Sequence, residues 1–117
     1  MAAGKLKLKV EQGADFNKTL TWSSGTPATP INLTGCTARM QMRPSVTSST
    51  VLLELTTENG GITLGGAAGT INLAATAVQT AAITAKAAVY DLEIVYSGGA
   101  VRRLLEGTVT ISPEVTR

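Results

Sequence analysis

The chain has 117 residues, of which 44% are hydrophobic but only 3% aromatic, so it fits one domain whose core is built of aliphatic side chains around very few rings. The formal charge is only +2, from ten lysines and arginines against eight aspartates and glutamates, and the basic residues are spread over several segments, which argues against nucleic-acid binding. The lack of histidine, with a single cysteine, excludes imidazole bases, Ser-His-Asp and Cys-His arrangements, ordinary zinc sites and an internal disulfide.

We expect a single domain over residues 1–117, with short flexible termini at 1–4 and 113–117. Charged residues make up 15% of the chain, well below the usual quarter, and small uncharged residues take their place. Such a surface suits packing against other subunits, including self-association. No signal segment and no membrane-spanning apolar run is evident, so we expect a protein made in the cytosol, with no membrane and no nucleic acid as partner.

Apolar residues recur with a period of two along most of the chain, and turn residues interrupt them often. This pattern predicts an all-β, antiparallel β-sandwich of about seven to eight strands. The first expected strand carries Lys5, Lys7 and Lys9 on one face, where lysines protect a sheet edge against aggregation. Lys18 falls on the apolar side of the second strand, so it reaches solvent at the rim or the strand is bulged there. The expected strands cover residues 5–10, 16–22, 36–43, 51–56, 62–64, 69–73, 88–96 and 101–111. The residues expected to face the core are Cys36, Ala38, Met40 and Met42 in the third strand, and Ala88, Tyr90, Leu92 and Ile94 in 88–96.

The segments between these strands carry turn and loop signals. We predict surface loops at 23–30 and 44–50, and a tight turn at Asn59-Gly60. At most one short helix is expected, near 75–84, with Thr76 as its cap and with Val78, Ala81, Ala82 and Ile83 near one face. The last strand is expected to bend near Gly107.

Two acidic residues are the strongest candidates for chemistry. Asp91 and Glu93 lie two residues apart on one strand face, the arrangement that acid and base catalysis by paired carboxylates would need. No cleft-forming aromatic residue flanks them, so we interpret them as a surface that pairs with Arg102 or Arg103 of the next strand.

The remaining candidate ligands are scattered. Asp15, Glu54 and Glu58, together with the two acids above, do not have the spacing of a calcium-binding loop. Cys36 lies in an alternating apolar pattern, and we expect a buried thiol rather than a nucleophile, because no histidine is present to activate it. The sequence therefore predicts no catalytic, cofactor-binding or metal-binding residue, and no cofactor.

Three segments carry a resemblance to a known family. They are Glu11-Gln12-Gly13-Ala14-Asp15-Phe16 leading to Leu20-Thr21-Trp22, the stretch INLTGCTARMQMR at 31–43, and Tyr90-Asp91-Leu92-Glu93-Ile94 followed by RLLEGTV at 103–109. The whole chain resembles small virion proteins of tailed bacteriophages and prophages. The middle segment is similar to the corresponding stretch in the N-terminal immunoglobulin-like domain of phage baseplate upper proteins.

The resemblance implies an immunoglobulin-like sandwich and a non-enzymatic structural protein of the virion, assembled in the cytoplasm of the bacterial host. In this interpretation the module docks by its sheet edges or loops onto the tail or baseplate as an adaptor, and its partners are other phage structural proteins. The alternative within the virion is a decoration or cement protein of the capsid head. A third hypothesis, binding of a carbohydrate or a cell surface, depends on Tyr96 as the one available ring.

Overall fold

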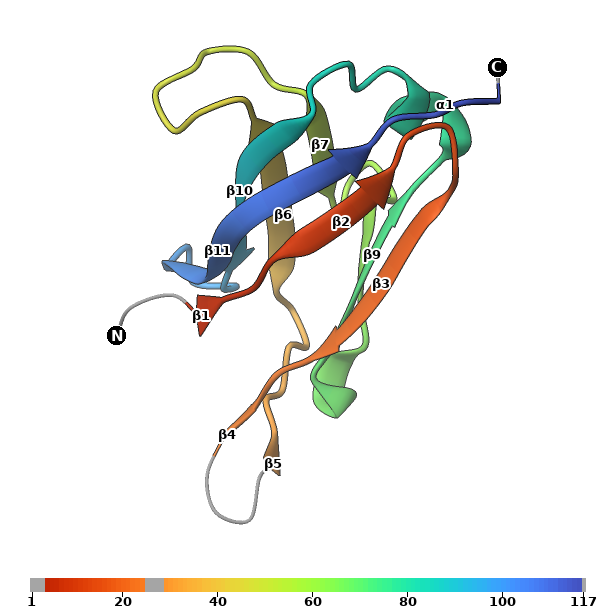
Figure 1. Cartoon of the computed structure of the whole chain (residues 1–117). Coiled ribbons are helices and arrows are strands. Elements are labelled where there is room, and N and C mark those ends of the chain that lie inside the picture. The colour runs from red at the N-terminus through yellow and green to blue at the C-terminus, as the bar shows by residue number, and fades with distance from the viewer. Residues whose placement is uncertain (1–3, 25–28, 117) are drawn as a thin grey trace.

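The computed structural model describes residues 4–24 and 29–116, which form two packed β-sheets and a short hairpin (Figure 1). The larger sheet has the order β1-β11-β10-β6-β7, and β2 also pairs with β11. Its strands are β1 (Gly4–Lys5), β2 (Leu8–Glu11), β6 (Thr37–Arg43), β7 (Leu53–Thr56), β10 (Ala87–Val95) and β11 (Val101–Ser112).

The smaller sheet has the order β3-β9-β8 and is antiparallel throughout. Its strands are β3 (Phe16–Thr21), β8 (Ile62–Leu64) and β9 (Thr70–Ala75); the helical elements are the 3-10 turn η1 (Gly66–Ala68) and the helix α1 (Ala77–Ala81). The predicted all-β sandwich is therefore confirmed. The division into β11-β10-β6-β7 on one side and β3-β9-β8 on the other is that of an immunoglobulin-like sandwich.

Alternating apolar residues place one face of each sheet in the core. In β10, Ala88, Tyr90, Leu92 and Ile94 are buried, as predicted, while the intervening residues are partly exposed. The buried hydrophobic residues of both sheets form one cluster, which is the expected arrangement for two amphipathic sheets that hide their apolar faces from water. Its members are Leu8, Val10, Phe16, Leu33, Ala38, Met40, Met42, Leu53, Leu55, Ile62, Ile71, Leu73, Ala75, Ile83, Ala88, Tyr90, Leu92, Ile94, Val109 and Ile111.

The N-terminal segment departs from the antiparallel pattern. Instead of one strand over 5–10 it forms β1 and β2, which both run parallel to β11 (Figure 1). The break lies at Leu6, whose carbonyl accepts a hydrogen bond of 2.6 Å from the Tyr90 hydroxyl. The lysines at 5, 7 and 9 are exposed, as predicted.

The irregularity of β11 lies away from the predicted position. The register with β10 shifts between Leu92 and Glu93, opposite Leu105 and Arg103, whereas Gly107 stays in register with Tyr90. A β-carbon on Gly107 would lie 2.3 Å from the Leu6 carbonyl oxygen. The bend expected near Gly107 is thus not accompanied by a register shift at that residue, and the missing side chain instead gives the N-terminal segment room to approach β11.

Lys18 lies at the rim of the sheet. The pairing of β3 with β9 runs from Phe16 to Thr21 without a register shift, so the strand has no bulge. The side chain is nonetheless exposed between the buried Phe16 and the half-buried Leu20. It therefore reaches solvent from the apolar side of an edge strand.

Two predicted irregular or helical segments differ in detail. The 23–30 loop contains a short antiparallel pair, β4 (Ser23–Ser24) with β5 (Thr29–Pro30), and its residues 25–28 lie outside the described residues. Thr76 caps α1 as expected, in a capping box with Gln79. The predicted helix face was wrong, because Val78 is 81% exposed while Thr80 is fully buried.

The predicted turn at Asn59-Gly60 is confirmed. Gly60 adopts φ +83°, which the predicted turn with Asn59 requires. After β11 ends, the Glu114 N–H donates to Gln12 Oε1 at 3.0 Å. The expected flexibility of the termini stays a prediction, and residues 1–3 and 117 lie outside the described part of the chain.

Candidate functional site

The predicted pair Asp91 and Glu93 lies at the centre of the outer face of the larger sheet, on β10. Each carboxylate meets an arginine: Glu93 Oε1 lies 2.7 Å from Arg39 Nε, and Asp91 Oδ2 lies 3.5 Å from Arg103 Nε. Arg102, the other expected partner, instead lies with its guanidinium 5.0 Å from the centroid of the Trp22 ring. The register shift in β11 explains this difference, because it places Arg102 opposite the buried Ile94 and turns it toward the other sheet.

The electrostatics of this face are those of an ion-pair array. Burial raises the pKa of the Asp91 carboxyl, Glu93 adds to this shift, and the Arg103 guanidinium opposes it. A third pair, Lys5 Nζ with Glu106 Oε1 at 3.2 Å, extends the array across the sheet. Neighbouring carboxylates that are each held by a different cation fix the register of adjacent strands.

Shallow hollows cross the same face. The largest has a volume of about 640 Å³ and is lined by both charged and neutral side chains of β6, β10 and β11, Asp91 and Glu93 among them. A second, of about 390 Å³, lies toward β7 and includes Glu54 and Glu58. Their polar groups already bond to each other, as in the 2.6 Å hydrogen bond from Gln41 Nε2 to Glu54 Oε2.

The other candidate ligands are not brought together. No group of three or more metal-ligating side chains occurs within residues 4–24 and 29–116. Asp15 Oδ1 accepts the Ala77 N–H at 2.8 Å, and Glu58 Oε1 accepts the Thr57 hydroxyl at 2.7 Å. Cys36, expected to be buried, is half-buried just before β6.

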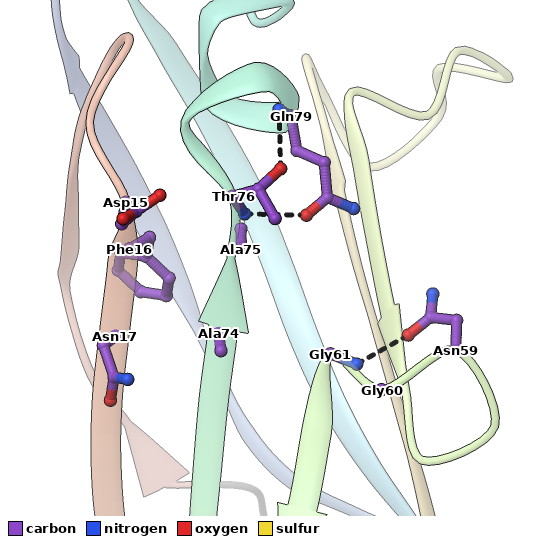
Figure 2. A pocket seen from close by; sticks show the side chains of 10 residues that line it. All are labelled: Asp15, Phe16, Asn17, Asn59, Gly60, Gly61, Ala74, Ala75, Thr76 and Gln79. Atoms are coloured by element: carbon purple, nitrogen blue, oxygen red, sulfur yellow. Dashed lines mark hydrogen bonds between the residues drawn. The ribbon is translucent and has the colours of Figure 1, made fainter.

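A hollow of about 390 Å³ lies at one end of the smaller sheet (Figure 2). Figure 2 shows Asp15 and Asn17 on one side, Ala74 and Ala75 on the floor, and Gln79 and Asn59 on the other side. The polar side chains here hold local structure: the Thr76 N–H donates to Gln79 Oε1 at 2.8 Å, and the Gly61 N–H donates to Asn59 Oδ1 at 2.8 Å. This hollow is therefore part of the scaffold that joins α1 to the sheet.

The outer face of the smaller sheet has a different chemistry from that of the larger one. Its side chains are hydroxyls, amides and one methyl, and none of them carries a charge. Asn72 Nδ2 links two strands by donating to Asn17 Oδ1 at 2.9 Å and to Thr19 Oγ1 at 2.8 Å. We call this the neutral face, and its residues are Asn17, Thr19, Thr21, Thr63, Thr70, Asn72 and Ala74.

The aromatic side chains contribute to packing. Phe16 and Tyr90 are buried, and Trp22 and Tyr96 are half-buried against the core. Tyr96, the ring on which carbohydrate binding depends, is thus only partly accessible. A sugar platform needs an exposed ring face, and Trp22 already carries the Arg102 guanidinium.

Sequence reasoning missed the neutral face as a feature, although its signal was present. Asn17, Thr19 and Thr21 alternate with Lys18 and Leu20, and Thr70 and Asn72 alternate with Ile71 and Leu73. The alternation does not say that these two segments are neighbours, so the face becomes visible only when β3 and β9 are paired.

Comparisons with known proteins give no further assignment. No protein-family model matches the chain, and no curated protein matches it significantly. None of the helices in the described residues is long and apolar enough to cross a membrane.

Proposed function

We propose that the protein is a non-enzymatic structural module of a tailed bacteriophage or prophage particle, which docks onto the tail or baseplate as an adaptor. The observation that carries the proposal is the contrast between the two outer faces. Charges on the larger sheet pair with each other, as in Arg39–Glu93, while the neutral face offers hydroxyl and amide groups. Burying a charge costs far more than burying a hydroxyl or amide that finds a hydrogen bond, so the neutral face suits coverage by another protein.

The particle itself is proposed from the resemblance of the three segments to virion proteins. The fold agrees with that resemblance at the level of an immunoglobulin-like sandwich, and a sandwich of this type supports many unrelated functions. The partners are accordingly proposed to be other structural proteins of the same particle.

The direct test is quantification of this protein by mass spectrometry in purified virions. A copy number similar to that of the baseplate or tail-tip proteins supports the tail adaptor. A copy number similar to that of the major capsid protein would replace it with a capsid decoration protein. Absence from purified virions would overturn the assignment to the particle.

A paired set of variants tests the neutral face as the docking surface. Thr63→Glu places a charge on that face, at an exposed position of β8, while Thr108→Glu places the same charge on the outer face of the larger sheet. Phage that lack the gene are complemented with each variant, and incorporation is measured. Loss of incorporation with Thr63→Glu alone is expected, and equal incorporation of both variants would contradict the assigned face.

A further inference from the structure

The edge strands of the two sheets differ in how well their outward backbone N–H and C=O groups are protected against pairing with another strand. β8 is only three residues long, and the β1–β2 border is interrupted at Leu6 and flanked by exposed lysines. Short, broken and lysine-flanked edges are the usual protections against strand addition. The remaining borders are β7 and β3.

The outward backbone groups of β7 are hydrogen-bonded by one side chain, that of Asn59. The Thr57 N–H donates to the Ala38 carbonyl, so the backbone groups of Thr56 and Glu54 alternate with it and point away from β6. The Asn59 side chain forms a hydrogen bond with each of these two residues. Its Oδ1 accepts the Thr56 N–H at 2.9 Å, and its Nδ2 donates to the Glu54 carbonyl at 3.1 Å. The turn at Asn59 thus closes this border.

Among residues 4–24 and 29–116, no side chain covers the outward backbone groups of β3 in this way. The Trp22 N–H donates to the Gly69 carbonyl at 2.8 Å, and the Ala74 N–H donates to the Gly61 carbonyl on the opposite side of β9 at 2.8 Å. Since hydrogen-bonded pairs alternate along an antiparallel ladder, residues 16, 18 and 20 face β9 and residues 17, 19 and 21 present their N–H and C=O groups outward.

These outward groups form a regular row. Asn17, Thr19 and Thr21 are spaced by about 7 Å, which is the spacing at which an edge strand presents its hydrogen-bonding groups to an added strand. Within the described residues no strand pairs with this edge, because β2 lies against β11 instead (Figure 1). At six residues, β3 is the longest of these border strands.

The charge of Lys18 indicates which side chain an added strand would place opposite it. It lies on the side of β3 that faces the core, yet it is exposed between the buried Phe16 and the half-buried Leu20. An added strand places one residue directly opposite Lys18 on the same side, and opposite charges stabilise such a cross-strand pair. Residues two positions away on that strand would lie opposite Phe16 and Leu20, where apolar side chains are favoured.

The β3 strand of a second copy does not suit this edge. Two β3 strands paired antiparallel with five residues each can align their outward groups in two registers only. One register sets Lys18 opposite Lys18 of the second copy, and the other sets it opposite Leu20. Both leave the ammonium group without a complementary charge.

We propose that the outer edge of β3 binds an extended segment of a different protein as an added antiparallel strand, with an aspartate or glutamate opposite Lys18 and apolar residues two positions to either side. The inference deepens the proposed function and rests on it for the partner's place in the particle, though not for the strand-binding edge itself.

The test uses two synthetic peptides and the full chain labelled with ¹⁵N. The first peptide is Thr-Val-Thr-Glu-Thr-Val-Thr, and the second has lysine in place of glutamate. On titration to millimolar peptide, amide shifts are expected along β3, strongest at Asn17, Thr19 and Thr21. The glutamate peptide should bind about three- to tenfold more tightly, since the central pair changes from opposite to like charges.

Two variants test separately the contribution of the Lys18 charge and that of the outward backbone groups of β3. Lys18→Glu should reverse the preference between the two peptides. Thr19→Pro removes one outward N–H, which an edge strand tolerates, and should abolish binding, while the matched Glu54→Pro on β7 should not. If Thr19→Pro does not fold, the Lys18→Glu reversal still decides the question.

The outcomes are distinct from those of the virion experiment. Shifts confined to β7 or β8, no shift at β3, or a preference that survives Lys18→Glu would overturn the strand-binding edge. Binding at β3 by a protein that is absent from virions would keep this inference and overturn the proposed function. Presence in virions without peptide binding at β3 would overturn this inference alone.

Discussion

Alkaline pH is expected to destabilise the fold through one side chain, Tyr90. This residue is 5% exposed, and its hydroxyl donates to the Leu6 carbonyl at 2.6 Å. Burial raises the pKa of the Tyr90 phenol to about 12 from 10.0. The folded protein therefore holds this proton more tightly than the unfolded chain does, and the stabilisation that is complete below pH 10 is lost as the pH rises toward 12.

The size of the effect follows from the two pKa values. At pH 11 the unfolded chain is mostly ionised at this phenol while the folded chain is mostly not, which lowers the free energy of unfolding by about 1.4 kcal/mol relative to pH 8. The limit well above pH 12 is about 2.7 kcal/mol. An ionised phenolate also cannot donate to Leu6, so the attachment of the N-terminal segment to β11 weakens at the same time.

The assay is guanidinium unfolding of the native chain and of Tyr90→Phe at pH 8 and pH 11. The two proteins have every other ionisable group in common, so the difference between their pH dependences isolates Tyr90. Tyr96→Phe is the matched control and should behave like the native chain. The reasoning is refuted if Tyr90→Phe loses as much stability between pH 8 and pH 11 as the native chain does.

Three further substitutions have defined consequences. Gly107→Ala should lower the free energy of unfolding by about 1–3 kcal/mol, since the new β-carbon would lie 2.3 Å from the Leu6 carbonyl oxygen. Thr80→Val should cost about 1–3 kcal/mol in the same unfolding assay, because the buried hydroxyl accepts the Gly13 N–H at 3.1 Å. Asn59→Ala should open the β7 border, which we expect to see as faster amide exchange there and as concentration-dependent association in sedimentation.

Matched controls exist for each of these variants. Gly98→Ala places a β-carbon where no atom lies within 4 Å, and Thr84→Val changes an exposed threonine. Asn32→Ala removes an exposed asparagine whose Oδ1 accepts a local N–H, that of Thr34. A control that destabilises the protein as much as its partner would contradict the assigned contact, and an Asn59→Ala protein that stays monomeric at high concentration would contradict the role of that side chain at the border.

Several elements follow directly from the order of residues. The inward residues of β6 and β10 were predicted correctly, apart from Cys36, which precedes β6 and is half-buried, because a period of two with aliphatic side chains has only one buried face. The cap of α1 was predicted as well, since Thr76 and Gln79 satisfy each other's backbone groups over four consecutive residues. Both are local effects that need no knowledge of distant neighbours.

Other features depend on contacts between distant segments. The partner of Asp91 is Arg103 rather than Arg102 only because the register of β11 shifts beside it. The face of α1 was misassigned because the helix packs through the Thr80 hydroxyl, which reaches Gly13 and the Ala14 carbonyl, and not through its apolar side chains.

The sequence by itself determined that this chain forms an all-β sandwich, which residues of β6 and β10 face its core, and that its few charges lie outside. The tertiary structure decided which strands are neighbours: β2 lies against β11, Asn59 closes the border of β7, and β3 is left with an outward row of backbone groups. The physical reason is that burial of apolar side chains is non-directional and can be read along the chain. The pairing of backbone groups between strands depends on partners far apart in the sequence, and only the folded chain brings them together.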